Sequence, residues 1–435
     1  MQHPTSTQTR RSALTEWLGT RPVANALFTS LVAFLTYACV FSYRKTFTVA
    51  TFDGIRIGVF SYQTLLIISQ VVGYMISKFY GIVFISALSR TGRWATVVLM
   101  IGISWACLLL FALTPDVLGL VWFFINGFML GFLWGVVFSY VEGRRSTDLA
   151  GSVMAVSFIF AGGFSRSVGK WLMIEHGVSE KWMPFMTGAL FALPLAVFLY
   201  LMEQIPPPDA ADEQARARRI PMQPADRKAF MKTLGTGIAL VTFTYIFLTI
   251  LRDIRDNYMA NMWRELGYGD NYGIFTRTET ITSVVVLGMM GTLVFVKRNM
   301  LAFRLVHGAI IAGFLTGGVA SALFLSGRLS GAAWMQLTGL GLYMAYIPFN
   351  SIFFERLIAS FRMAANVGFL MYITDAFGYL GSVSLMIVKE TMRFNITWSD
   401  YYAWGVLSFS VIGFATMAVS LGWFGRKYRT LFPVG

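Results

Sequence analysis

The chain has little charge, few cysteines and few histidines, and each shortage excludes a class of protein. Charged residues make up 13% of the 435 residues, whereas a soluble domain carries charge on about a quarter of its positions. The two cysteines, Cys39 and Cys107, lie inside apolar runs, so neither a disulfide framework nor a cysteine zinc site is expected. The three histidines are scattered, so a histidine metal site is not expected either. We therefore predict no metal and no cofactor.

Long apolar runs are abundant. Hydrophobic residues make up 56% of the sequence, and the mean hydropathy is +0.63. A membrane-spanning helix needs about 20 mostly apolar residues. Twelve runs of suitable length lie near 24–50, 57–86, 94–113, 117–140, 150–172, 182–202, 233–262, 276–296, 302–326, 332–355, 363–388 and 401–424. The sequence therefore predicts an all-α protein that crosses the lipid bilayer twelve times and is not an enzyme.

A polar segment divides the runs into two sets of six. It contains three consecutive prolines and a mixed-charge stretch, and it follows the sixth run. Two six-helix halves, related as parallel repeats around a midplane site, are the layout of the major facilitator fold. The predicted division is a tail at 1–23, a first bundle at 24–202, a linker at 203–232, a second bundle at 233–424 and a tail at 425–435.

Basic residues outside the runs lie mainly in alternate loops. Arg93, Arg144, Arg145, Lys297 and Arg298 fall on the same side as the N-terminus, and the opposite loops carry few bases. Cytoplasmic loops carry the excess of Lys and Arg, so we expect both termini in the cytoplasm and a bacterial inner-membrane location. The net charge of +14 reflects this loop bias, and no nucleic-acid partner is expected. A monomer is the expected state.

The first and seventh runs share a short pattern. Arg44 follows Tyr37 by seven residues, and Arg252 follows Tyr245 by the same interval. Residues seven apart share one face of a helix, so each tyrosine and its arginine form one stripe. The match indicates an internal duplication. A pseudo-twofold axis would then bring the two arginines together across a central cavity.

Eight basic residues but only four acidic ones lie inside the apolar runs or near their ends. The bases are Arg44, Lys45, Lys78, Arg166, Lys170, Arg252, Arg255 and Arg277. The acids are Asp253, Asp256, Glu279 and Asp375. An intramembrane charge costs at least about 2.5–3.5 kcal/mol on insertion scales. The positive excess therefore predicts an anionic solute, because a guanidinium binds phosphate and carboxylate well.

We expect Arg44 and Arg252 to bind this anion from opposite halves, with Tyr37 and Tyr245 on the same helical faces. Lys45 and Lys78 would add positive charge nearby. A structural ion pair between Arg252 and the acid one turn later is a competing interpretation for that arginine.

The other intramembrane charges are cavity or coupling candidates. Arg166 and Lys170, four residues apart, would line the cavity or flank an interface. Arg255 and Asp256 belong to the same run as Arg252, and an Arg255–Asp253 pair is conceivable. Arg277 and Glu279 would form a pair or a gate, and Asp375 would either neutralise a base or couple transport to protons.

Two segments resemble a known family. The first run continues from Tyr37 to Arg44-Lys45-Thr46-Phe47, and the second contains Ser77-Lys78-Phe79. Both are similar to the first two helices of the organophosphate:phosphate antiporters. The resemblance implies that Arg44 and Arg252 clamp a phosphate while Lys78 adds charge, and that phosphate is the exchanged solute. The fifth run departs from the family, because it carries Arg166 and Lys170 where the family has a histidine.

The resulting hypothesis is a facilitator that moves a small anionic, phosphorylated solute by alternating access, with phosphate or protons as the coupling ion. Small-residue runs at 161–163 and 317–320 would allow close helix approach. One alternative is a proton-coupled symporter or exporter of a carboxylate, siderophore or drug-like compound, with Asp375 or Glu279 titrating. A second alternative is a non-transporting sensor with the same fold.

Overall fold

The computed structural model describes residues 12–87, 92–142, 144–209, 212, 224–363, 367–392 and 396–432. Residues 1–11 of the predicted N-terminal tail, residues 210, 211 and 213–223 of the predicted linker, and the last three residues lie outside this described part. The long helices of the first half are α2 (Pro22–Lys45), α3 (Tyr62–Ala87), α4 (Arg93–Leu113), α5 (Asp116–Val141), α6 (Thr147–Glu175) and α7 (Met183–Glu203). Those of the second half are α9 (Pro224–Glu265), α10 (Gly273–Val294), α11 (Asn299–Leu325), α12 (Gly331–Tyr346), α14 (Val367–Thr391) and α15 (Trp398–Leu431).

Shorter elements complete the described chain. They are α1 (Ala13–Gly19), η1 (Thr46–Val49), β1 (Arg56–Ile57), β2 (Phe60–Ser61), η3 (Ile347–Asn350) and α13 (Phe353–Phe361). Strands β1 and β2 form a small antiparallel hairpin between α2 and α3. The tenth predicted run is a bent pair, in which α12 with η3 meets α13 at 48°. The bend follows Pro348, which has no backbone N–H to donate to the helix ladder.

Each predicted apolar run coincides with one of the twelve long helices. Within the described residues, eight helices are long and apolar enough to cross a membrane alone, and the bent pair makes a ninth. The three other long helices, α3, α10 and α14, also carry buried polar residues, among them Gln63, Glu279 and Thr374.

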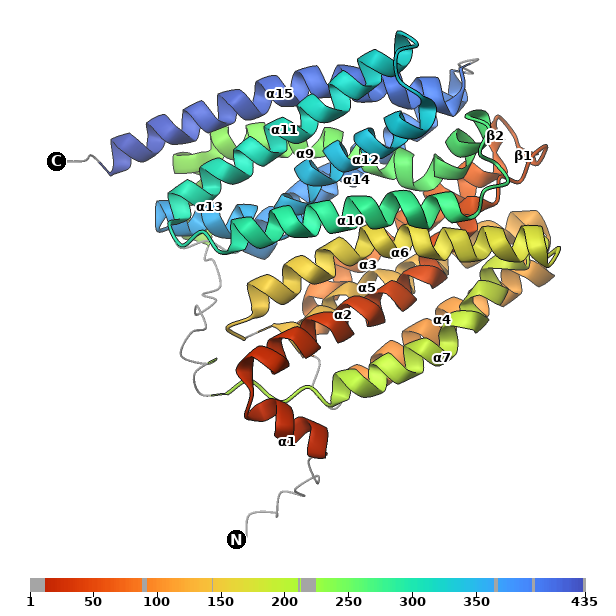
Figure 1. The fold of residues 1–435 in the computed structure, drawn as a ribbon, viewed down its shortest axis with the longest axis horizontal. Helices are drawn as coiled ribbons and strands as arrows, with labels where there is room; N and C mark the ends of the chain where they lie inside the picture. Colours follow the sequence, from red (N-terminus) through yellow and green to blue (C-terminus); the bar gives the residue numbers. More distant parts are fainter. Residues whose placement is uncertain are drawn as a thin grey trace.

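The two halves lie side by side, with α2–α7 below and α9–α15 above in Figure 1. Helix α6 packs against α10, and α3 packs against α14, along the interface between the halves. Helix α1 and the C-terminal end of α15 lie at one end of the bundle, which we call the terminal end (Figure 1). The β1–β2 hairpin marks the opposite end, which we call the hairpin end (Figure 1).

Small residues allow α6 and α10 to approach closely, as their sequence predicts. A Cβ atom on Gly163 would lie 2.6 Å from the carbonyl oxygen of Phe275. In the second half, a Cβ atom on Gly318 would lie 2.9 Å from the Cβ of Ser410. Small side chains at helix contacts are typical of membrane bundles, where packing replaces the hydrophobic effect as the attractive force.

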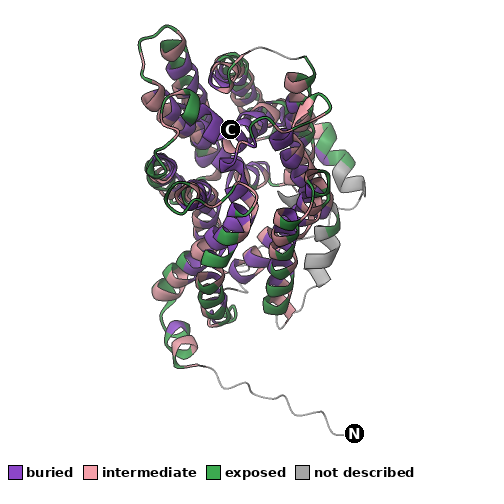
Figure 2. Cartoon of the chain, turned by 90° about the vertical axis from the view of Figure 1, so that its right-hand side faces the viewer, coloured by how far each residue is buried: buried purple, intermediate pink, exposed green. Residues whose placement is uncertain are grey.

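The outer surface of the bundle is apolar. Figure 2 shows buried residues where helices face one another and exposed residues on the outward faces. Large hydrophobic side chains occupy many of those outward positions, for example Leu99, Leu193, Val284 and Val411. Such extensive exposed apolar surface is what a lipid-facing bundle requires.

Candidate functional site

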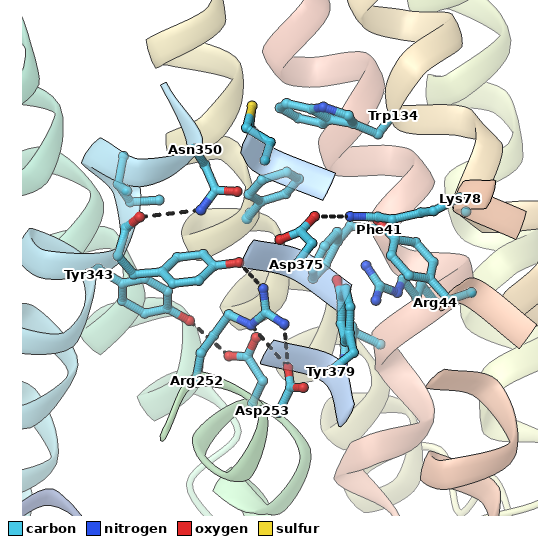
Figure 3. Close-up of a pocket in the computed structure, with 18 of the residues that line it drawn as sticks. Phe41, Arg44, Lys78, Trp134, Arg252, Asp253, Tyr343, Asn350, Asp375 and Tyr379 are labelled. Atoms are coloured by element: carbon cyan, nitrogen blue, oxygen red, sulfur yellow. Dashed lines mark hydrogen bonds and ion pairs between the residues drawn. The ribbon is translucent and has the colours of Figure 1, made fainter. Parts of the chain in front are cut away.

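A cavity of about 200 Å³ lies between the two halves. Its charged lining residues are Arg44, Lys45, Lys78, Arg252, Asp253, Asp256 and Asp375. Its aromatic lining residues are Phe41, Tyr74, Trp134, Phe158, Tyr343, Tyr346 and Tyr379. The close-up in Figure 3 shows charged side chains converging on this space from both halves.

Lys78 and Asp375 form an ion pair across the interface. Lys78 Nζ on α3 lies 2.6 Å from a carboxylate oxygen of Asp375 on α14 (Figure 3). Tyr245 on α9 donates its hydroxyl to the other oxygen of Asp375 at 2.6 Å. Asp375 therefore neutralises a base, which was one of its two expected roles, and Tyr245 contributes through this carboxylate without lining the cavity itself.

Arg252 pairs with its own neighbour in sequence. The guanidinium lies 2.6 Å from a carboxylate oxygen of Asp253, and it also donates to the hydroxyl of Tyr346. The anticipated ion pair between Arg252 and Asp256 does not form among the described contacts. The other carboxylate oxygen of Asp253 is buried and has no hydrogen-bond partner among the described residues.

Asp256 instead faces Arg166, which reaches it from the other half. Arg166 on α6 is buried, and one guanidinium nitrogen lies 3.8 Å from a carboxylate oxygen of Asp256. The same guanidinium donates to Thr48 at 3.1 Å. Tyr343 donates its hydroxyl to Asp256 at 2.8 Å. Arg166 thus lies behind the cavity wall, where it joins α6 and η1 to α9.

Lys45 is held by an amide rather than a carboxylate. Its side chain is buried, and Nζ donates to the side-chain oxygen of Asn257 on α9 at 2.6 Å. Lys45 lines the cavity beside Arg44 although successive helical residues point about 100° apart. Lys45 is the last residue of α2, and η1 begins at Thr46, so the regular α-helical geometry ends at this position.

Arg44 differs from the other cavity cations. Its guanidinium carbon lies 3.7 Å from the ring centroid of Tyr74 and 5.9 Å from that of Phe41. Its side chain forms no hydrogen bond or ion pair with the described residues, and its Nε is buried without a partner. In Figure 3 it projects into the cavity from the wall opposite Arg252. Arg44 is therefore positioned to receive an anion.

The positive excess expected from the sequence is thus reduced by pairing. The four acids each neutralise one base, in the pairs Lys78–Asp375, Arg166–Asp256, Arg252–Asp253 and Arg255–Glu279. Lys45 is hydrogen-bonded to the neutral amide of Asn257, and the guanidinium of Arg44 contacts the rings of Tyr74 and Phe41. Within the described residues, the free positive charge of the cavity therefore concentrates at the end of α2.

Four charged candidates besides Arg166 also lie outside the cavity lining. Arg255 and Glu279 form a fully buried pair at 2.6 Å between α9 and α10, so Glu279 does not pair with Arg277. Residues two apart on a helix do not face each other, and Arg277 is exposed. Lys170 is half-buried and lies near Asp53 in the loop after α2. The anticipated Arg255–Asp253 pair likewise does not form among the described contacts.

Tyr37 lies directly behind the cavity wall. Its ring packs edge-on against Trp134 and Phe158, with centroids 5.1 and 5.2 Å apart. It supports the rings that line the cavity instead of lining it. The sequence argument did not single out Tyr74 or Tyr379, although a signal existed, because each lies one helical turn from a charged lining residue, Lys78 or Asp375.

Polar contacts close the hairpin end. Gln63 on α3 and Asn261 on α9 exchange side-chain hydrogen bonds of 3.1 and 3.2 Å. Glu390 on α14 accepts hydrogen bonds from Ser61 and Thr64 at 2.7 and 2.8 Å. Ser167 on α6 and Thr276 on α10 add a further hydrogen bond of 2.7 Å between the halves. The two halves are therefore closed against each other at the hairpin end.

A surface ion pair also spans the two halves at this end. Asp53, in the loop after α2, binds Arg264 near the end of α9. The hydrogen bond from Arg264, with a smaller contribution from the charge of Lys170, lowers the pKa of Asp53. Both partners are well exposed, so solvent screens the pair and its effect on stability is small.

Solved structures of similar shape define the class of protein. A mutant of the nucleoside transporter NupG matches with a TM-score of 0.60 at 14% identity, covering 91% of this chain and 99% of that one. A D-xylose-proton symporter matches with a TM-score of 0.60 at 14% identity, covering 91% and 97%. A bacterial homologue of the human lysosomal transporter Spinster, inward-facing and unoccupied, gives 0.55 at 14% identity, covering 94% and 98%. The protein is a multi-pass membrane protein with the major facilitator fold.

The family follows from the sequence itself. The chain belongs to DUF5690, a family of unknown function, and the match covers residues 46–427. Among curated proteins, none matches this sequence. The matched region includes every charged lining residue of the cavity except Arg44 and Lys45, which immediately precede it.

Proposed function

We propose that this protein is a secondary transporter that moves a small organic anion through the central cavity by alternating access. The observation that carries the proposal is Arg44, a cation in a cavity between the halves with no acidic partner among the described residues. Leaving an arginine unpaired in a membrane protein is costly, and a solute anion would offset that cost. An anion between the halves can stabilise their closure, because a ligand shifts a conformational equilibrium through differential contacts.

The resemblance of α2 and α3 to the organophosphate:phosphate antiporters extends the proposal to a phosphorylated solute exchanged for phosphate. Arg44 and the adjacent Lys45 would bind the phosphate, and Arg252 would approach it from the second half. The Arg252–Asp253 pair at 2.6 Å weakens this clamp, because one of its two arginines is already neutralised. Both termini are proposed to lie in the cytoplasm, which would place the closed hairpin end outside.

Anion binding is tested by thermal unfolding of the purified protein in detergent. The panel contains inorganic phosphate, glycerol phosphate, sugar phosphates, dicarboxylates and monocarboxylates, since a ligand raises the midpoint by mass action. Arg44→Ala is expected to weaken binding by about 30-fold or more, because losing one side of a buried charge pair costs about 2–5 kcal/mol. Arg44→Lys should retain part of it. The matched control, Arg277→Ala, removes an exposed arginine and should bind as the wild type does.

Two outcomes would contradict this proposal. One is a panel in which no anion shifts the unfolding midpoint of the wild type. The other is an anion that shifts the midpoint of Arg44→Ala as much as that of the wild type. Arg252→Ala then distinguishes the models, because a two-arginine clamp loses binding in both single variants, whereas a site built on Arg44 loses it chiefly in one.

Proton coupling is a second candidate property, and the position of Asp375 favours it. Protonation of Asp375 would remove the charge that holds Lys78 and would release one link between the halves. We expect Asp375→Asn to abolish proton movement coupled to an anion that binds, while exchange of that anion across the membrane persists. A pH-sensitive dye inside proteoliposomes measures the former, and labelled-anion exchange measures the latter. Unchanged proton movement in Asp375→Asn would rule this residue out as the coupling group.

A further inference from the structure

Several polar groups around the cavity are occupied by one another, while the second carboxylate oxygen of Asp253 has no partner among the described residues. Tyr343 donates to Asp256, Arg252 donates to Tyr346, and the Asn350 amide donates to the carbonyl oxygen of Tyr346 at 3.2 Å. A sugar phosphate would bring several hydroxyl groups into this space. Each hydroxyl that found no partner would lose its hydrogen bonds to water without compensation, which disfavours such a solute.

Ring faces, by contrast, are plentiful on the wall beside Arg44. Phe41, Trp134 and Phe158 line this side of the cavity. Trp134 and Phe158 have ring centroids 4.6 Å apart, and those of Phe41 and Phe158 are 6.0 Å apart. None of these three rings carries a hydroxyl group. They form a continuous apolar aromatic surface, which we call the aromatic wall, and Arg44 projects from the same half.

The size of the space restricts the solute further. An engineered apolar cavity of about 150 Å³ binds benzene, so the cavity of about 200 Å³ has room for one substituted six-membered ring. Pockets for drug-sized ligands start at about 300 Å³. The space therefore suits one small ring with a carboxylate and is too small for a siderophore or a multi-ring compound.

From these three features we infer that the transported anion is a monocyclic aromatic carboxylate, with its carboxylate on Arg44 and its ring against the aromatic wall. The inference rests on the proposed transport of an anion and names its chemical class. A single carboxylate matches the single cavity-lining cation that has neither an ion pair nor a hydrogen bond among the described residues. Aromatic rings bind one another in offset or edge-on geometry, which a saturated ring cannot reproduce.

The test compares ligands that differ in one property. Benzoate and cyclohexanecarboxylate share a carboxylate and a six-membered ring, but only benzoate has a π face. Benzamide keeps the flat ring and lacks the charge, and glycerol phosphate keeps an anionic group without a ring. Dissociation constants are measured by calorimetric titration of the full-length protein in detergent. We expect benzoate to bind about tenfold more tightly than cyclohexanecarboxylate, since two or more ring contacts differ between them.

A matched pair of variants locates the effect. Phe158→Leu should bring the affinity for benzoate close to that for cyclohexanecarboxylate, because it removes the central ring of the aromatic wall. Phe164→Leu changes the same residue type on the same helix at an outward-facing, exposed position, and should leave the preference intact. Thermal unfolding without ligand confirms that both variants fold.

The outcomes separate this inference from the proposed function. If the two carboxylates bind equally and both need Arg44, or if only phosphorylated ligands bind, the aromatic class is wrong and anion transport stands. If benzamide binds as tightly as benzoate, the site does not recognise charge, and both fail. Tight, Arg44-dependent binding of benzoate that Phe158→Leu reduces and Phe164→Leu does not supports both.

Discussion

Replacing Glu279 by alanine is expected to lower the free energy of unfolding by about 3–5 kcal/mol, because removing one partner strands a buried charge. Glu279 and Arg255 are 1% and 0% exposed and lie 2.6 Å apart. Arg255 has no room to move toward solvent, since α12 covers it so closely that a Cβ on Gly339 would lie 2.4 Å from its guanidinium. Equilibrium unfolding in mixed micelles measures the loss.

Two companion variants identify the cause. Arg277→Ala removes the exposed base two residues from Glu279, and should change stability by no more than about 0.5 kcal/mol. The double variant Arg255→Met with Glu279→Met should recover much of the loss, because an apolar pair of similar volume leaves no charge buried. If Glu279→Ala and Arg277→Ala have the same free energy of unfolding, the Arg255–Glu279 pair does not stabilise the fold.

Cross-linking the two halves at the hairpin end is expected to reduce transport to background, with recovery when a reductant is added. Ser167 on α6 and Thr276 on α10 have side-chain oxygens 2.7 Å apart, so cysteines at these positions are close enough for a disulfide. Alternating access requires this end to open, and a covalent bond between α6 and α10 prevents it. The native cysteines, Cys39 and Cys107, are buried and do not compete.

The measurement is uptake, into proteoliposomes, of an anion that binds the purified protein. The matched control is a Thr244→Cys/Thr416→Cys disulfide, since those hydroxyls are 2.8 Å apart but lie on α9 and α15 of the same half. This cross-link should leave uptake unchanged, because each half is expected to move as one body. Normal uptake by the fully oxidised Ser167→Cys/Thr276→Cys protein would exclude opening at the hairpin end as a transport step.

The sequence predicted much of the fold because the lipid bilayer imposes a simple requirement on it. Each spanning segment must be a helix with about 20 mostly apolar residues, and such runs are visible in the chain without any tertiary information. The helices follow these runs to within a few residues at most ends; for example, α4 spans Arg93–Leu113 where the run was marked at 94–113. The bend between α12 and α13 was not predicted, since Pro348 lies inside an otherwise continuous apolar run.

The spacing of residues along a single helix also predicted two of the cavity residues. Arg44 and Arg252 occupy equivalent positions in the repeat, and both line the cavity. The tyrosines of the same two stripes, Tyr37 and Tyr245, do not line the cavity and act through other residues. Tyr37 supports the aromatic wall, and Tyr245 donates its hydroxyl to Asp375.

By itself, then, the sequence determined the twelve long helices of the described residues and their division into two sets of six. It also showed that a few of these helices carry charged residues within their apolar runs. Only the tertiary structure decided which charges neutralise one another. Helical spacing reports neighbours three or four residues apart, whereas Lys78 and Asp375 meet across almost 300 residues of chain, at a sequence separation of 297. Arg44 stands out for the same reason: its lack of a partner depends on how α2, α3 and α14 pack, and no pattern within one helix contains that information.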